Sequence, residues 1–203
     1  MLGRQILAAD IRETAADTVG VSALSDFVTG PFQRAKKPQG QSAFPCIIDV
    51  PRGRTLYVPG LDARKLREAS FANLYAKLEA RSVLSVPWEL GTINRPSITT
   101  EPIYVFSSGR CGSTLLHKIL IAAGIQGVSE PDIATALISR TYFDRRLARP
   151  LLRWVTRNYV RDLVSALSDG EGPFVIKLRS QFCRAAEPLL KGSRERRTIF
   201  MAC

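Results

Sequence analysis

The sequence of 203 residues lacks several features that would assign it to a common class. Its four cysteines have neither a CxxC pair nor the spacing of a metal site, so we expect unpaired thiols in a reducing compartment. No apolar run approaches the length of about eighteen residues that a membrane span needs. The N-terminus also lacks the continuous apolar core of a secretory signal. We therefore expect a cytoplasmic protein without a membrane span.

Acidic residues are few as well. The 18 Asp and Glu stand against 29 Lys and Arg, which gives a formal net charge of +11. Such an excess suits a polyanionic partner, whether nucleotide phosphates, nucleic acid or an anionic membrane surface. No recognised DNA- or RNA-binding motif accompanies the charge, so no nucleic-acid partner is expected. A hydrophobic content of 45% and a charged content of 23% are ordinary for globular proteins and argue against wholesale disorder.

The most informative stretch runs from Ile103 to Leu120 and reads IYVFSSGRCGSTLLHKIL. Its first residues are β-branched or aromatic, which predicts a buried strand. Small residues follow, and from Leu115 onward apolar residues recur at helical spacing. Strand, glycine-bearing turn and helix bring unpaired backbone N–H groups and the positive end of a helix dipole to one point. This order predicts a binding site for phosphate or sulfate.

The Walker A loop, Gly-x4-Gly-Lys-Ser/Thr, fits this stretch only in part. When the pattern is aligned on Gly112 and Thr114, Ser107 stands at the first glycine. Ser113 then replaces the lysine that reaches the β- and γ-phosphates, and the cation inside the loop is Arg110. A nucleoside triphosphatase without that lysine loses charge stabilisation, so ordinary hydrolysis of ATP or GTP is disfavoured.

The loop resembles the 5′-phosphosulfate-binding loop of the sulfotransferases, in which a strand leads into a Gly-Arg-Ser-Gly-Ser/Thr-Thr-Leu-Leu type of sequence. Here the matching piece is Gly109 to Leu116, with Cys111 at a position that serine often holds. A second piece, Ser129 to Pro131, follows the loop helix as in many bacterial members. The resemblance covers roughly Pro102 to the end, and the residues before it resemble no family that we recognise.

The resemblance implies transfer of a sulfuryl group from 3′-phosphoadenosine 5′-phosphosulfate to a hydroxyl or amine, without a metal. The acceptor would be a small molecule, a lipid or a carbohydrate. Arg110 would supply positive charge to the leaving phosphate, and Glu130 is the candidate general base. The residues expected to bind the co-substrate are Ser108, Gly109, Arg110, Cys111, Gly112, Ser113 and Thr114.

Plainer roles stay open for these residues. Ser113 and Thr114 can simply cap a helix, and Arg110 can form a surface ion pair. Glu130 can be an acidic first-turn residue that the helix dipole favours, with Ser129 as the cap. Cys111 can also be a reactive thiol, because a helix N-terminus lowers the pKa of a thiol.

The chain departs from the family at two places. Cytosolic relatives have a base histidine after the next central strand, where this chain has Leu178 to Gln181, so a histidine mechanism is in doubt. Lys177 and Arg179 are instead candidates to approach the sulfuryl group, and the single histidine, His117, is expected to point away from the ligand. Residues 197–203 resemble the strand that precedes the Arg-Asp/Asn-Pro motif of the 3′-phosphate site, and the sequence stops there. The chain is then either a fragment of a longer protein or a natural truncation with weakened or absent activity.

Alternating strand and helix patterns predict an α/β fold with a parallel central sheet, flanking helices and the ligand loop at the carboxyl end of a strand. The resemblance implies a P-loop NTPase-like sulfotransferase architecture that is incomplete at the C-terminus. We expect residues 1–41 to be a weakly helical or loose segment, helical around Ile6, Leu7 and Ile11, with a linker from Gln33 to Ser42. Residues 42–98 form a small α/β cap, and residues 99–203 form the sulfotransferase-like domain.

Within the cap the patterns predict strands over 46–50 and 55–58, joined by a hairpin. A helix follows Asp62, and an edge strand or extended loop covers 83–90, because Pro87 interrupts it. The helix is expected to bury Leu66, Phe71, Leu74 and Leu78. Further on, arginines four residues apart from Arg149 to Arg161 mark either a solvated helix face or a docking surface for an anionic acceptor.

Two other functions remain alternatives. A non-catalytic or truncated remnant would bind anions or a partner through the same loop. A nucleotide kinase is disfavoured by Ser113 in place of the lysine and by the Ser129 to Pro131 piece.

Overall fold

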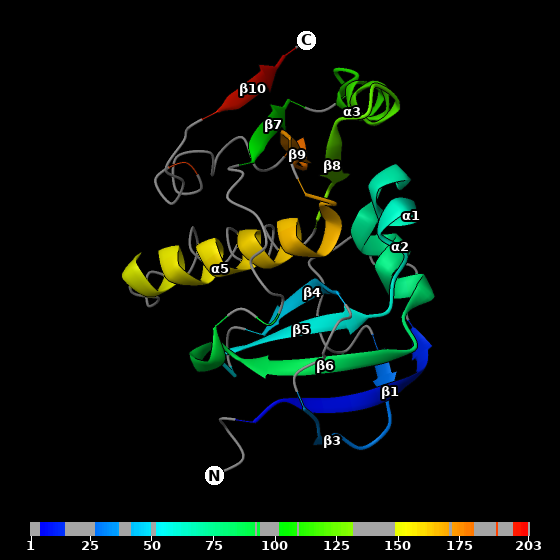
Figure 1. The fold of residues 1–203 in the computed structure, drawn as a ribbon, viewed down its shortest axis with the longest axis vertical. Coiled ribbons are helices and arrows are strands. Elements are labelled where there is room, and N and C mark those ends of the chain that lie inside the picture. Colours follow the sequence, from blue (N-terminus) through cyan, green and yellow to red (C-terminus); the bar gives the residue numbers. More distant parts are fainter. Residues whose placement is uncertain are drawn as a thin grey trace.

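The computed structural model describes residues 5–14, 27–36, 42–49, 52–91, 93, 102–108, 110–131, 149–170, 172–180, 190 and 197–202, with the backbone alone for 149–153 and 156. Within these residues the chain is a mixed α/β protein with one antiparallel and one parallel sheet (Figure 1). Of the helices in this part of the chain, none combines the length and the apolar character that crossing a membrane requires.

The antiparallel sheet has the strand order β2-β1-β6-β5-β4, and β3 pairs with Leu7 and Ala8 at the start of β1. Its strands are β1 (Leu7–Thr14), β2 (Phe27–Thr29), β3 (Gln33–Arg34), β4 (Ala43–Asp49), β5 (Arg54–Pro59) and β6 (Ser82–Pro87). The predicted hairpin is confirmed, because β4 and β5 are antiparallel neighbours. Gly53 lies in their connection with φ of 61°, a backbone conformation that favours glycine.

The helical start expected for residues 1–41 is wrong, since Leu7–Thr14 is a strand. Ile6 and Ala8 contact one buried cluster, whereas Ala9 and Ile11 contact the other, so neighbouring residues point to opposite faces. This period of two is that of a strand. Backbone pairing with β6, β2 and β3 then fixes the segment. Gln33–Arg34, at the start of the expected linker, forms β3, while residues 37–41 lie outside the described residues.

The edge strand expected over 83–90 is also wrong, because β6 lies between β1 and β5. Pro87 is its last residue, so the missing N–H falls at the end of the ladder instead of interrupting it. A short 3-10 helix, η3 (Trp88–Leu90), follows.

Two helices replace the single one expected after Asp62: α1 (Ala63–Glu68) and α2 (Ala72–Glu79). Asp62 caps α1 as predicted, since its carboxylate accepts the N–H groups of Arg64 (2.9 Å) and Lys65 (3.2 Å). The break between the helices changes the helical phase, and the predicted apolar face is wrong beyond Leu66. Helix α2 buries Ala72, Asn73, Ala76 and Lys77, whereas Phe71, Leu74 and Leu78 are exposed.

The predicted parallel sheet is confirmed, with the strand order β10-β7-β9-β8. Its strands are β7 (Ile103–Ser107), β8 (Gln126–Ser129), β9 (Phe174–Lys177) and β10 (Thr198–Met201). Helix α3 (Ser113–Ala122) connects β7 to β8, and α5 (Arg149–Leu167) lies between β8 and β9 in the chain. These two connections run in opposite directions along the sheet. Right-handed crossovers therefore place the helices on opposite faces, as Figure 1 shows.

Helix α5 joins the two sheets. It packs against β4 of the antiparallel sheet and β8 of the parallel sheet, and in Figure 1 it crosses the space between them. Its buried face includes Val155, Tyr159, Leu163 and Leu167, while Arg157 and Arg161 are exposed. One cluster of buried side chains continues through α5 from Phe44 of β4 to Phe106 of β7, so the two sheets share a core.

Candidate functional site

The predicted anion loop connects the carboxyl end of β7 with the N-terminus of α3. Gly112 precedes the helix with φ of 80°, where any side chain would be strained, and α3 has no side-chain cap. The Ser113 hydroxyl donates a hydrogen bond to Ser107 Oγ at 3.1 Å, and both residues are buried. Because Gly112 has no side chain, no capping side chain at this position competes for the N–H groups at the start of α3, an arrangement suited to an anion. Gly109 lies outside the described residues.

Cys111 shows where the donors of the loop converge. Desolvation raises the pKa of its thiol, but hydrogen bonds from the loop together lower the pKa by more, so the net shift is downward. These donors are the backbone N–H groups of Ser113, Cys111 and Ser108 and the side chain of Ser107. The thiol itself lies 3.7 Å from the carbonyl oxygen of Met201 on β10. The loop thus favours negative charge at this point.

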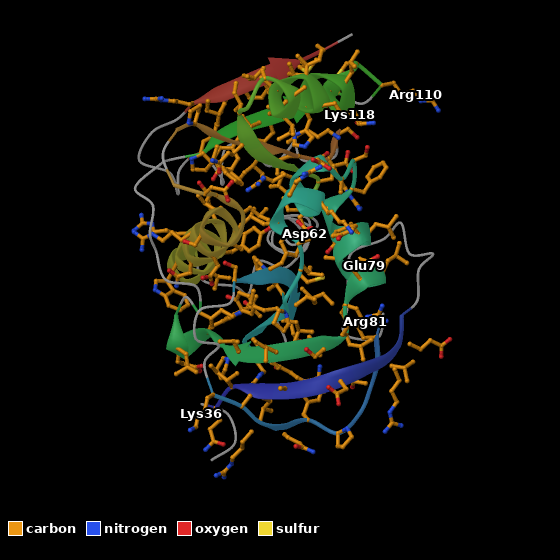
Figure 2. The ribbon with its side chains drawn as sticks, turned by 45° about the vertical axis from the view of Figure 1, so that its right-hand side comes forward. Lys36, Asp62, Glu79, Arg81, Arg110 and Lys118 are labelled. Carbon is orange, nitrogen blue, oxygen red and sulfur yellow. The ribbon has the colours of Figure 1, made fainter. Side chains whose placement is uncertain are left out.

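Arg110 does not face this point. Its side chain is exposed, and Figure 2 shows it at the outer edge of the molecule, pointing away from the ribbon. With the residues that the structure describes, Arg110 forms no ion pair, so the surface ion pair considered for it is not observed here. The guanidinium of Arg110 therefore lies at the rim of the loop, and the backbone of Arg110 has a φ of 51°.

Lys177 brings a cation to the loop from the neighbouring strand. It is the last residue of β9, its side chain is 3% exposed, and its Nζ donates to Thr114 Oγ1 at 3.4 Å. Strands β7, β8 and β9 are parallel, so their carboxyl ends meet at one edge of the sheet. A lysine thus reaches the loop although Ser113 stands where a Walker A loop has its own.

Glu130 follows β8 at the same edge, and its carboxylate faces two cations. Oε1 accepts a hydrogen bond from Lys177 Nζ, and Oε2 lies 3.4 Å from Nε of Arg179. The backbone N–H of Glu130 donates to the Lys177 carbonyl at 2.7 Å. The structure thus brings Glu130, Lys177 and Arg179 together beside Thr114. Residues 132–148, in which Ser129 is expected to cap a helix, lie outside the described residues.

Backbone conformation sets two of the predicted residues apart. Among the described residues, Arg110 and Glu130 are the non-glycine residues with positive φ, each at 51°. Bulky side chains adopt this left-handed conformation at a cost, and such residues gather at functional sites. Each of the two lies just after the carboxyl end of a parallel strand.

His117 lies on the buried side of α3. Its side chain is 1% exposed, and Nε2 is 3.0 Å from the carbonyl oxygen of Arg67 in α1. Because a carbonyl only accepts, Nε2 carries the proton and Nδ1 keeps a lone pair, which has no partner among the described residues. Burial lowers the pKa of His117, the bond to Arg67 opposes this, and the charge of Lys177 lowers the pKa further.

The apolar spacing of α3 gave no sign of this arrangement. Ser113 and His117 are the buried residues of the helix, whereas Leu115 and Ile119 are exposed. The ion pair of Glu130 with Lys177 was also missed, although a signal exists. Both residues stand at the ends of strand-like runs, and a parallel sheet brings such ends to one edge. No group of three or more His, Cys, Asp or Glu in the described part of the chain is arranged to hold a metal ion.

The site thus consists of N–H groups of the loop and the start of α3, the Ser107, Ser113 and Thr114 hydroxyls, and the Lys177, Arg179 and Glu130 cluster. Such donors suit a phosphate or sulfate group. Comparison of the chain with models of known protein families, with curated proteins and with solved structures gave no match in any of the three.

Proposed function

We propose that the chain is a sulfotransferase with a P-loop-like architecture that binds the 5′-phosphosulfate end of 3′-phosphoadenosine 5′-phosphosulfate in the loop after β7. The observation that carries the proposal is the contact between Lys177 Nζ and Thr114 Oγ1. It restores a cation to a loop whose sequence lacks the Walker A lysine, and does so from β9. An ammonium group at this place forms charge-assisted hydrogen bonds to a sulfate or phosphate oxygen.

The residues present fit an anionic group of this kind. Gly112 has the left-handed backbone that leaves the start of α3 open, and the loop lowers the pKa of Cys111 by placing N–H groups around its sulfur. The loop N–H groups, Ser113, Thr114 and Lys177 would hold the 5′-phosphate. The co-substrate supplies an activated sulfuryl group, and the acceptor supplies a hydroxyl or amine.

The strand order supports the same position for the ligand. The connection from β7 to α3 and β8 leads to one side of β7, and β10 pairs on its other side. Ligands of open parallel sheets bind where the strand order reverses in this way, beyond the carboxyl ends of the strands. Ser107, at the end of β7, belongs to that place.

A nucleotide kinase fits the donor set less well. P-loop phosphoryl-transfer enzymes hold Mg²⁺ with the Ser/Thr hydroxyl of the loop, which Thr114 could supply, and with a carboxylate close to the phosphates. Here the end of β9 and the residues after it present Lys177 and Arg179, and the carboxylate of Glu130 already faces both. The cluster therefore suits an anionic group that arrives without a metal.

The general-base role predicted for Glu130 sets a requirement. Both of its carboxylate oxygens face cations, so a proton from the acceptor can reach it only after one contact is released. Arg110 is exposed at the rim of the loop, from which a long side chain can turn toward a bound nucleotide.

Calorimetric titration tests the proposal. Adenosine 3′,5′-bisphosphate should bind more tightly than ATP to the wild-type chain. Lys177→Met should weaken bisphosphate binding by roughly 10- to 100-fold, the loss of a hydrogen bond from a charged group. Lys36→Met is the matched control, since Lys36 is exposed and lies far from Arg110 at the opposite end of the molecule in Figure 2.

Tighter binding of ATP, or equal effects of the two lysine substitutions, would contradict the proposal. A panel of hydroxyl and amine acceptors with labelled co-substrate then separates catalysis from binding. Bisphosphate binding without turnover on any acceptor would favour the non-catalytic, anion-binding alternative.

A further inference from the structure

The cations beside the loop are not open to solvent in the free protein. Lys177 is 3% exposed and Arg179 is 15% exposed, and both face the carboxylate of Glu130, which is itself 13% exposed. An anionic ligand at the loop therefore meets Lys177 already engaged by Glu130 and Thr114. To contact the ammonium fully, the ligand has to take the place of the carboxylate.

Charge makes this replacement favourable for a strong anion. Two cations and one carboxylate leave the cluster with a single net positive charge. When the carboxylate withdraws, the ligand meets two positive charges in a partly buried site, where charge interactions are weakly screened. A phosphate or sulfate group offers more acceptor oxygens than the carboxylate, so it can satisfy both cations.

The backbone holds the carboxylate in its position. Glu130 has φ of 51°, and its N–H donates to the carbonyl oxygen of Lys177 at 2.7 Å. The left-handed conformation is unfavourable for a residue with a long side chain, and the strand-end hydrogen bond maintains it. The backbone at the end of β8 thus places Glu130 beside Lys177, and the carboxylate that contacts the ammonium is 13% exposed.

We propose that Glu130 is an internal counter-ion of the ligand site. It neutralises Lys177 and Arg179 in the free protein and releases them to the anionic group of the ligand. This inference rests on the proposed function for the identity of the ligand, and it gives Glu130 a role other than that of a general base. The counter-ion lowers the affinity for every anion, and most for those that carry too little charge to displace it.

Glu130→Gln tests this role, because the amide keeps the size of the side chain and removes its charge. The variant should bind inorganic sulfate and adenosine 3′,5′-bisphosphate about tenfold more tightly, since the cations no longer have to be freed. It should also unfold at a lower temperature without ligand, because Lys177 loses its ionic partner. A merely structural role would lower stability and affinity together, whereas the counter-ion role moves them in opposite directions.

Glu68→Gln is the matched control. It changes the net charge by the same amount, and Glu68 pairs with Arg64 on the exposed side of α1. Thermal shifts with sodium sulfate, with sodium chloride at equal ionic strength as reference, and calorimetry with the bisphosphate supply the measurements. If Glu130→Gln does not fold, Glu130→Asp serves instead, because its shorter carboxylate withdraws from the cations and should give a smaller gain in affinity.

The outcomes separate the two proposals. Unchanged or weaker anion binding by Glu130→Gln overturns the counter-ion role, and the proposed function stands if the bisphosphate is still preferred to ATP. Tighter sulfate binding together with a preference for ATP supports the counter-ion and contradicts the sulfotransferase. No binding of any of these anions by either protein overturns both.

Discussion

Two partly or fully buried carboxylates, in different regions of the molecule, are held by different kinds of donor. Asp162 of α5 is 1% exposed and accepts hydrogen bonds from the Tyr57 hydroxyl (2.6 Å) and the backbone N–H of Ile93 (3.3 Å). Glu130 lies at the carboxyl edge of the parallel sheet and faces Lys177 and Arg179. These two donors to Asp162 are neutral, whereas the side chains that face Glu130 are cations.

This difference separates a structural joint from a ligand site. The Tyr57 hydroxyl belongs to the antiparallel sheet, so its bond to Asp162 ties β5 to α5. Burial and the neighbouring carboxylate raise the pKa of Tyr57 well above its usual value, and the phenol therefore stays a donor. Cations around Glu130, by contrast, can be satisfied equally by a ligand. We expect substitutions in the first region to change stability and those in the second to change affinity.

The largest effect is expected for Asp162→Ala. The substitution leaves the buried Tyr57 hydroxyl and the Ile93 N–H without this acceptor, and the free energy of unfolding should fall by about 3 kcal/mol. Urea denaturation monitored by fluorescence measures the loss. Asp10→Ala, the same change at an exposed position of β1, is the control and should alter stability by less than about 0.5 kcal/mol.

Affinity for adenosine 3′,5′-bisphosphate in the folded Asp162→Ala protein should match that of the wild type. A loss of affinity comparable with that of Lys177→Met would show that the two regions are coupled. It would contradict the assignment of stability to the first region and of affinity to the second.

The parallel sheet could be predicted from sequence because its signals are local. The apolar strand β7, the glycine at residue 112 and the helix after it lie within one short stretch, and their order alone places a loop at a strand end. The antiparallel sheet was less predictable. Its first strand depends on pairing with β6, some 70 residues later, and Ile6, Leu7 and Ile11 suggest a helix when read alone.

In the candidate site, too, the local features could be predicted from the sequence and the long-range contacts could not. Composition and order placed Ser113 and Thr114 at the loop, but the partner of Thr114 comes from Lys177, 63 residues away. Whether a strand-end side chain turns to one face or the other depends on register, and a single sequence does not give the register of parallel strands. The left-handed backbone of Glu130 gave no sequence signal, because glycine is the residue expected there.

An intermediate effect, on the pH dependence of stability, is expected from His117, which links the loop helix α3 to α1. Its pKa is lowered by burial and by Lys177, so the unfolded chain binds a proton more readily than the folded one. Stability should therefore be complete above the ordinary histidine pKa, near 6.5, and decrease as the pH falls below it. The slope stays below that of one titrating group, about 1.4 kcal/mol per pH unit.

His117→Gln tests this assignment, because it removes the titrating ring and keeps a side chain that can donate to the Arg67 carbonyl. Unfolding is followed between about pH 7.5 and pH 5.5, above the range in which most carboxylates titrate. The difference in stability between wild type and variant should change with pH in the stated direction. A constant difference over this interval would rule out His117 as the titrating group.

The smallest effect on bisphosphate affinity is expected from Arg110→Ala. Its comparison with Lys177→Met contrasts a cation at the rim of the loop with a cation on the buried side. Arg110 and Lys177 both carry one positive charge, but Arg110 is exposed and Lys177 is buried. Solvent and salt screen an exposed charge, so the substitution should weaken bisphosphate binding by only about threefold, and less as ionic strength rises. Calorimetry at low and high sodium chloride measures this dependence. A loss as large as that of Lys177→Met, and insensitive to salt, would mean that Arg110 turns inward when the ligand binds and that the charge predicted from the loop sequence acts there after all.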